Sequence, residues 1–175
     1  SIRLPFAPYT PKNGERIDAF AGQSTLGLSS VTQPNHDFSG MRVLLVEDNR
    51  VNQEVARRFL LKLNCEVCCA GNGELALEVL KHEQFDCVFM DCQMPVLDGY
   101  EATHQIRDGK AGGAGRAVFI AAMTAHAMSW DRGKCMQMGM DHYISKPVGL
   151  HDFRRALELA VQKAAIVARP PMPRS

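Results

Sequence analysis

Short apolar segments alternate with amphipathic segments between residues 41 and 167. Five of them are apolar or rich in β-branched residues and have the length of strands, at residues 42–46, 66–70, 87–91, 117–123 and 142–145. Several are almost continuously apolar, which is typical of parallel strands covered on both faces. The pattern therefore predicts a buried parallel sheet.

Between these segments, apolar residues recur at helical spacing. Three stripes stand out: Val51, Val55, Phe59, Leu60 and Leu63; Leu75, Ala76, Val79 and Leu80; and Phe153, Ala156, Leu157, Ala160, Val161 and Ala164. Asp98 and Glu101 have the spacing of a capping box, and Gly139 is placed to end a helix that starts near Ala127. The alternation predicts a doubly wound α/β fold with five parallel strands and right-handed crossovers.

The flanks differ in composition. Residues 1–40 are rich in Pro, Gly, Ser, Thr and Asn and have no sustained period, so we expect a flexible linker. Residues 168–175 contain three prolines and cannot continue a helix, so we expect a disordered tail. The folded domain is then expected over residues 41–167.

Charge and cysteine content narrow the class of protein. The formal net charge of +1 gives no electrostatic case for a nucleic-acid or membrane partner, and no apolar run approaches the roughly 18 residues of a membrane span. The six cysteines are Cys65, Cys68, Cys69, Cys87, Cys92 and Cys135. They do not form two pairs with the spacing of metal ligands, and most of them lie in apolar runs. We expect reduced, structural thiols and a cytoplasmic location.

Polar groups follow four of the expected strands. Glu47 and Asp48 follow the first strand, Asp91 ends the third, Thr124 and Ala125 follow the fourth, and Lys146 follows the fifth. The carboxyl ends of parallel strands meet at one edge, where such sheets bind their ligands. Converging carboxylates suit Mg²⁺, and a hydroxyl and an ammonium beside them suit a phosphoryl group.

The amino-acid sequences of the stretches around these polar residues are specific enough to indicate a family. The stretches 43–49 (VLLVEDN), 90–99 (MDCQMPVLDG), 123–128 (MTAHAM) and 140–147 (MDHYISKP) together resemble the receiver domain of two-component response regulators. They are most similar to receivers of hybrid sensor histidine kinases, and residues 1–8 resemble the final strand of a kinase ATP-binding domain. The resemblance implies a flavodoxin-like (βα)5 receiver fold.

The resemblance also implies roles for individual residues. Asp91 would accept the phosphoryl group of a phosphohistidine. Mg²⁺ would bind Asp48, Asp91 and the main-chain carbonyl of Gln93, with Glu47 assisting directly or through water. Thr124, Ala125 and Lys146 would contact the phosphoryl oxygens, and Tyr143 would follow Thr124 inward as an aromatic switch.

The expected function is a phosphorelay step. The donor would be the phosphohistidine domain of a kinase, in the same or another chain, and a histidine phosphotransfer domain would be the further partner. The domain would promote its own phosphorylation and dephosphorylation, whereas the kinase activity would belong to a parent hybrid kinase, anchored in the inner membrane or not. The open alternatives are a response regulator without its output domain and a docking module that is not phosphorylated.

Gln93 and Trp130 bear on two further possibilities. An aspartyl phosphohydrolase of the haloacid-dehalogenase type requires a second Asp two residues after the nucleophile, and Gln93 occupies that place. Trp130 is expected to face away from the apolar side of its helix, where it marks either a partner surface or a partly covered surface residue.

Overall fold

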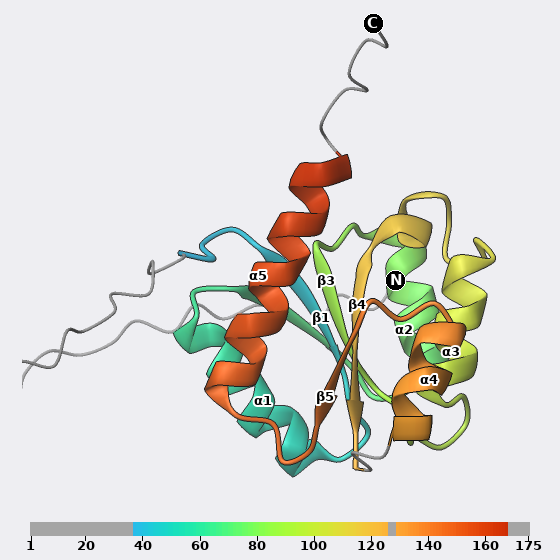
Figure 1. The fold of residues 1–175 in the computed structure, drawn as a ribbon, viewed down its shortest axis with the longest axis horizontal. Coiled ribbons are helices and arrows are strands. Elements are labelled where there is room, and N and C mark those ends of the chain that lie inside the picture. The colour runs from blue at the N-terminus through green and yellow to red at the C-terminus, as the bar shows by residue number, and fades with distance from the viewer. Residues whose placement is uncertain (1–36, 126–128, 168–175) are drawn as a thin grey trace, which may run out of the picture. The chain divides into compact units, whose positions relative to one another are not determined.

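The computed structural model describes residues 37–125 and 129–167, with the backbone alone for residues 114 and 129–132. Five parallel strands form one sheet in the order β2-β1-β3-β4-β5, with helices on both faces (Figure 1). The strands are β1 (Arg42–Val46), β2 (Glu66–Ala70), β3 (Cys87–Asp91), β4 (Phe119–Thr124) and β5 (His142–Ser145). The helices are α1 (Arg50–Lys62), α2 (Gly73–His82), α3 (Gly99–Arg107), α4 (Ser129–Gln137) and α5 (Leu150–Val167).

Two apolar layers sandwich the sheet. Alternate residues of β1 point to opposite faces, so that Leu44 belongs to one core cluster and Leu45 to the other. Helices α2, α3 and α4 pack against the first cluster, and helices α1 and α5 pack against the second (Figure 1). This double cover explains why the strands read as almost continuous apolar runs.

The fourth strand starts later than predicted. Residues Ala114–Ala117 form a turn of 3-10 helix, η1, and β4 begins at Phe119 instead of residue 117. Three glycines lie just before or within this turn, and that flexible backbone favours a tight turn over strand pairing. The other four strands have the predicted bounds.

The helix ends follow local signals. The Asp98 side chain accepts a hydrogen bond from the Glu101 amide at 2.8 Å and so caps α3. Asn49 caps α1 in the same way, accepting from the amides of Val51 and Asn52. Gly139 follows α4 with φ +90°, the left-handed conformation that ends helices.

Several residues predicted to face the core lie outside it. Val51 is 72% exposed, and Val55, Leu75 and Val161 are also exposed. Val51 lies in the first turn of α1, beyond the carboxyl end of β1, so no strand lies beneath it. Phe38, by contrast, falls in the segment expected to be linker and is fully buried against the α1/α5 face.

Three further observations concern the cysteines, the helices and Trp130. The six cysteines are free thiols. In the described part of the chain, no helix is both long enough and apolar enough to cross a membrane. Trp130 belongs to α4, but its side chain lies outside the described part, as do all of residues 126–128.

Candidate functional site

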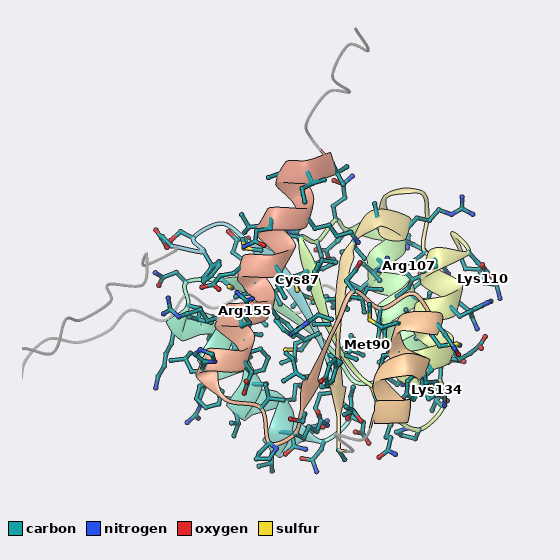
Figure 2. The ribbon with its side chains drawn as sticks, viewed as in Figure 1. Cys87, Met90, Arg107, Lys110, Lys134 and Arg155 are labelled. Atoms are coloured by element: carbon teal, nitrogen blue, oxygen red, sulfur yellow. The ribbon has the colours of Figure 1, made fainter. Side chains whose placement is uncertain are left out.

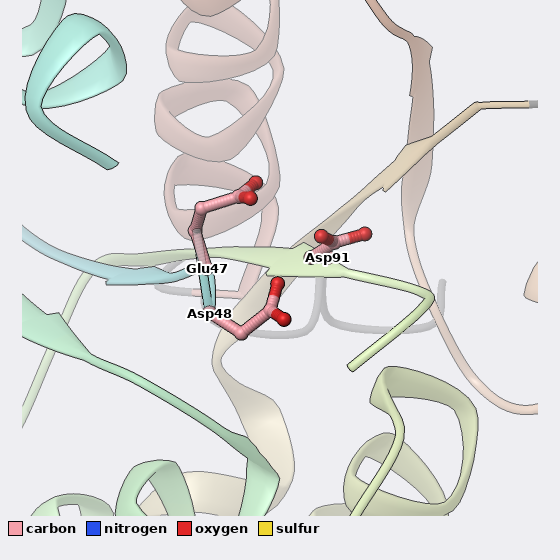
Figure 3. Close-up of side chains that lie close together, drawn as sticks. All are labelled: Glu47, Asp48 and Asp91. Atoms are coloured by element: carbon pink, nitrogen blue, oxygen red, sulfur yellow. The ribbon is translucent and has the colours of Figure 1, made fainter. Parts of the chain in front are cut away.

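Three carboxylates meet where β1 and β3 end. Glu47 and Asp48 directly follow β1, Asp91 is the last residue of β3, and these two strands are neighbours in the sheet. The chain leaves β1 toward β2 on one side and continues from β3 toward β4 on the other, which opens a crevice between the two strand ends. One oxygen from each carboxylate lies within 4.8 Å of the others (Figure 3).

The three carboxylates differ in exposure. Glu47 is 2% exposed and Asp91 is 4% exposed, whereas Asp48 is exposed to solvent. Burial raises the pKa of the Asp91 carboxyl, and the nearby Glu47 charge acts in the same direction. Hydrogen bonds from Lys146 and from the Gln93 amide oppose this rise in pKa. The cluster thus contains negative charge that a cation would stabilise.

Lys146 supplies a positive charge to this cluster. Its Nζ lies 2.6 Å from Asp91 Oδ2 and 2.7 Å from Glu47 Oε2. Burial would lower the pKa of Lys146, but hydrogen bonds to the two carboxylates outweigh it and raise that pKa. The backbone also places the residue, because the Lys146 amide donates to Thr124 O at 2.7 Å. The peptide bond between Lys146 and Pro147 is cis.

Glu47 is held by groups that sequence reasoning missed. Its Oε1 accepts from Asn52 Nδ2 at 3.1 Å, so both carboxylate oxygens have protein partners. Gln53 donates to the main-chain carbonyls of Glu47 at 3.0 Å and Ala70 at 3.3 Å, which ties α1 to the ends of β1 and β2. The available signal was a pair of amide side chains in the first turn of the helix after an acidic pair.

Thr124 and Ala125 also lie at this edge. Thr124 ends β4, the neighbour of β3, and is buried, whereas Ala125 is exposed. The Gln93 amide donates to Asp91 Oδ1 at 3.1 Å, which ties the loop after β3 to the carboxylate. Six predicted site residues from β1, β3, β4 and the segments after them therefore lie at one edge of the sheet, together with Lys146 after β5.

Tyr143 lies on β5, away from the carboxylates. It is half-buried and packs against the core cluster under α2, α3 and α4. β5 pairs with β4, and Tyr143 is in register with Ala122. The position fits a residue that reports changes at β4, and the predicted switching role stays a prediction.

The site opens into a hollow of about 370 Å³. Its lining combines polar site residues with apolar residues of α1 and of the segment after β5: Glu47, Asn52, Val55, Ala56, Met123, Ala125, Lys146, Pro147 and Val148. A larger hollow of about 620 Å³ lies near Ser39, Asp86 and Phe119, at the amino ends of the strands and away from the carboxylates.

Cys92 follows Asp91 directly, but its thiol is unsuited to reaction. A hydrogen bond with Cys135, together with burial, raises the pKa of the Cys92 thiol far above its ordinary value. Reactive cysteines are thiolates with lowered pKa. Cys92 therefore serves packing, inside the same core cluster as Cys135.

Comparison with known proteins gives the same picture. The model of the response regulator receiver domain matches residues 43–158. Hybrid signal transduction histidine kinase K of Dictyostelium discoideum is 40% identical over 126 residues, which are 70% of this chain and 10% of that protein. Sensor histidine kinase GacS of Pseudomonas protegens is 39% identical over 107 residues, which are 61% of this chain and 12% of that protein. The chain thus spans about a tenth of these relatives.

Solved structures agree with the predicted fold. The receiver domain of sensor histidine kinase PA1611 from Pseudomonas aeruginosa, with a magnesium ion in its active-site cleft, is 40% identical at a TM-score of 0.64, covering 71% of this chain and 99% of that one. The receiver domain of yeast Ssk1, crystallised with the histidine phosphotransfer protein Ypd1, is 36% identical at a TM-score of 0.64, covering 71% and 91%. These similarities confirm the predicted receiver fold.

Proposed function

This chain belongs to the family of response regulator receiver domains, and we propose that Asp91 accepts the phosphoryl group in a phosphorelay. The observation that carries the proposal is the Lys146 ammonium, 2.6 Å from Asp91 Oδ2, beside two further carboxylates. In the proposed step, an Asp91 oxygen forms a bond to phosphorus while the bond between phosphorus and the donor histidine nitrogen breaks. Such a transfer requires positioning and charge neutralisation more than covalent chemistry from the protein.

The donor set fits Mg²⁺. Asp48, Asp91 and the main-chain carbonyl of Gln93 would hold the ion, and the exposed side of Asp48 gives it access. Glu47 would assist through water, because Asn52 and Lys146 already bind its two oxygens. When bound, the ion would neutralise charge on the phosphoryl oxygens.

Lys146, Thr124 and Ala125 would receive the phosphoryl group. Lys146 is already held at Asp91 and needs only a small shift to contact an oxygen of the new acyl phosphate. The Thr124 hydroxyl and the exposed Ala125 would border the same position. We propose that Thr124 then draws Tyr143 inward, so that the added charge changes the surface near α4 and β5.

The proposed protein partners are helical histidine domains that carry or receive the phosphoryl group. Their docking surface would be formed by the exposed residues Val51, Val55 and Pro147 together with the half-buried Val148. All of these except Val51 line the hollow that also contains Glu47 and Lys146. A histidine must come within bonding distance of Asp91, so the partner has to cover this rim. The co-crystal of the Ssk1 receiver with Ypd1 supports this class of partner.

The wider context is also proposed. The similarity to hybrid histidine kinases supports a parent protein of that class, with the segment before Phe38 linking a kinase core to the receiver and residues 168–175 as a tail. The receiver would act in the cytoplasm. A response regulator lacking its output domain is the second candidate, since the Ssk1 receiver belongs to a response regulator.

Incubation with acetyl phosphate and Mg²⁺, followed by intact mass measurement, tests the acceptor. We expect one labile phosphoryl adduct on the wild type and on Asp108→Asn, a matched change at an exposed Asp. Asp91→Asn should give none. An adduct that persists in Asp91→Asn, or no adduct and no amide shift with beryllofluoride, would overturn the proposal in favour of a docking module.

A protein donor tests the docking surface. We expect Val51→Asp to slow transfer from a phosphorylated histidine phosphotransfer domain by about tenfold, the effect of losing one well-packed interface contact. Ile166→Asp changes an equally exposed apolar residue at the far end of α5 and should leave the rate unchanged. Both variants should react normally with acetyl phosphate, which needs no docking surface. Equal rates for Val51→Asp and Ile166→Asp with the protein donor would place the surface elsewhere.

A further inference from the structure

The loop between β3 and α3 contains a tight, strained turn. The Leu97 amide donates to Pro95 O at 2.9 Å, which closes a three-residue turn around Val96. Val96 has φ +72°, a conformation that a β-branched side chain rarely adopts. Such a turn persists only where the surrounding structure holds it.

The first residue of α2 provides that hold. The Gly73 amide donates to Leu97 O at 3.1 Å. The first amides of a helix have no partner within the helix, so this donor is available to the loop. The turn is therefore fastened from outside by a helix that contributes no carboxylate to the site.

The fit between Gly73 and the loop leaves no room for a side chain. A Cβ at position 73 would lie 2.7 Å from Leu97 O and 2.8 Å from the Ala102 Cβ. Real Cβ atoms do not approach other atoms this closely, and Ala102 is fully buried on α3. A methyl group at Gly73 would have to displace the backbone of the loop.

The same loop touches the acceptor. At the start of the loop, the Cys92 amide donates to Met123 O at 2.9 Å. At its end, the Gly99 amide donates to Cys92 O at 3.3 Å. Between these hydrogen bonds, the Gln93 amide donates to Asp91 Oδ1 at 3.1 Å. Because the loop is short and closed, a displacement of Leu97 would also move Gln93.

We infer that Gly73 is a positioning residue for the phosphorylation site: it holds the β3–α3 loop so that the Gln93 amide donates to the Asp91 carboxylate and the Gln93 carbonyl would be placed to bind Mg²⁺. Gly73 itself contributes no carboxylate or other ligand atom to the cluster of Glu47, Asp48 and Asp91. The inference rests on the proposed function, because the role of Gln93 in metal binding does.

The test is a Mg²⁺ titration of the full chain in which binding is monitored by amide NMR. Gly73→Ala should weaken Mg²⁺ binding by about tenfold, the lower range for losing a partner that orients a metal ligand. Gly71→Ala is the matched control, because its Cβ would meet only Leu75 Cδ1 at 4.0 Å, and it should bind Mg²⁺ as the wild type does. Ile106→Val removes one buried methylene group from the same core layer and controls for lost stability without a change at the loop.

Two results would overturn the inference while leaving the proposed function intact. One is Mg²⁺ affinity of Gly73→Ala within twofold of the wild type, and the other is an equal loss of affinity in Ile106→Val. Absence of Mg²⁺ binding by the wild type itself would overturn the proposed function and this inference with it. If Gly73→Ala does not fold, Ala102→Ser provides a second variant that crowds the same contact from α3. It should also weaken Mg²⁺ binding. Unchanged Mg²⁺ affinity in Ala102→Ser counts against the inference.

Discussion

The Lys146 ammonium lies 2.6 Å from the Asp91 carboxylate, at the ends of two strands that are not neighbours in the sheet. β4 lies between them, so the Lys146 side chain must reach across the end of that strand. The contact gives the buried Asp91 charge a counter-charge in the absence of metal. It also leaves the ammonium beside the atom that would carry the phosphoryl group.

Removing that counter-charge should destabilise the metal-free protein. We expect Lys146→Met to lower the free energy of unfolding by about 3 kcal/mol, because it leaves two buried carboxylates without their shared cation. Urea unfolding followed by circular dichroism measures the change. The exposed Lys110 (Figure 2) provides the matched control, since Lys110→Met removes a charge that faces water. Equal stability of the two variants would show that the Lys146 contact contributes nothing.

The stability effect of Asp91 should depend on pH. Its pKa is raised by burial, so the folded chain holds the Asp91 proton more tightly than the unfolded chain does. The stability that this group contributes is then complete below its ordinary pKa of 3.8 and is lost as the pH rises through the raised value. Metal-free Asp91→Asn should therefore be more stable than the wild type at pH 7, and its advantage should shrink as the pH falls. Unfolding curves at several pH values test this, and an advantage that grows toward acid would contradict it.

Mg²⁺ should reverse the order of these two proteins. At a concentration of 100 times the dissociation constant, the ion should stabilise the wild type by about 2.7 kcal/mol. Asp91→Asn and Asp48→Asn should gain little, whereas Asp108→Asn should gain as much as the wild type. Thermal unfolding with and without Mg²⁺ measures the gain. Because the carboxylates must be ionised to bind, the gain should fade with acidification, and a gain in Asp48→Asn equal to that of the wild type would exclude Asp48 as a ligand.

Val96 offers a test of strain without loss of packing, because its side chain is 73% exposed. Asn tolerates positive φ better than a β-branched residue, so Val96→Asn should stabilise the fold by about 1 kcal/mol. Val51→Asn is the matched control, since Val51 is equally exposed but lies in a regular helix. If both substitutions shift the melting temperature equally, positive φ at Val96 stores no strain.

Phe38 tests where the folded domain begins. A chain starting at Asp37 should unfold cooperatively, whereas one starting at Met41 should be less stable by about 3 kcal/mol or more, the effect of removing a buried aromatic side chain. Phe38→Ala in the longer chain should reproduce most of the loss. Ile166→Ala is the control, because that apolar side chain is 74% exposed. Identical unfolding curves for the two chain lengths would place the start of the domain at residue 41, as the sequence predicts.

Much of the site could be predicted because its residues follow recognisable strands. Residues 42–46 are followed by two acids and residues 87–91 end in one, and parallel strands must bring such ends to one edge. Asn52, Gln53 and Gly73 could not be identified in the same way. Their roles depend on contacts with Glu47 and Leu97 that the spacing along the chain does not reveal.

The sequence by itself determined the alternation of strands and helices, and with it the sheet edge where Glu47, Asp48, Asp91, Thr124 and Lys146 gather. That information is local, because apolar periodicity and helix caps act over a few residues. Only the tertiary structure decided that Asn52 and Lys146 donate hydrogen bonds to the two Glu47 carboxylate oxygens. It also decided that the first turn of α2 holds the β3–α3 loop. Those contacts join segments whose distance and orientation are fixed by packing across the whole sheet.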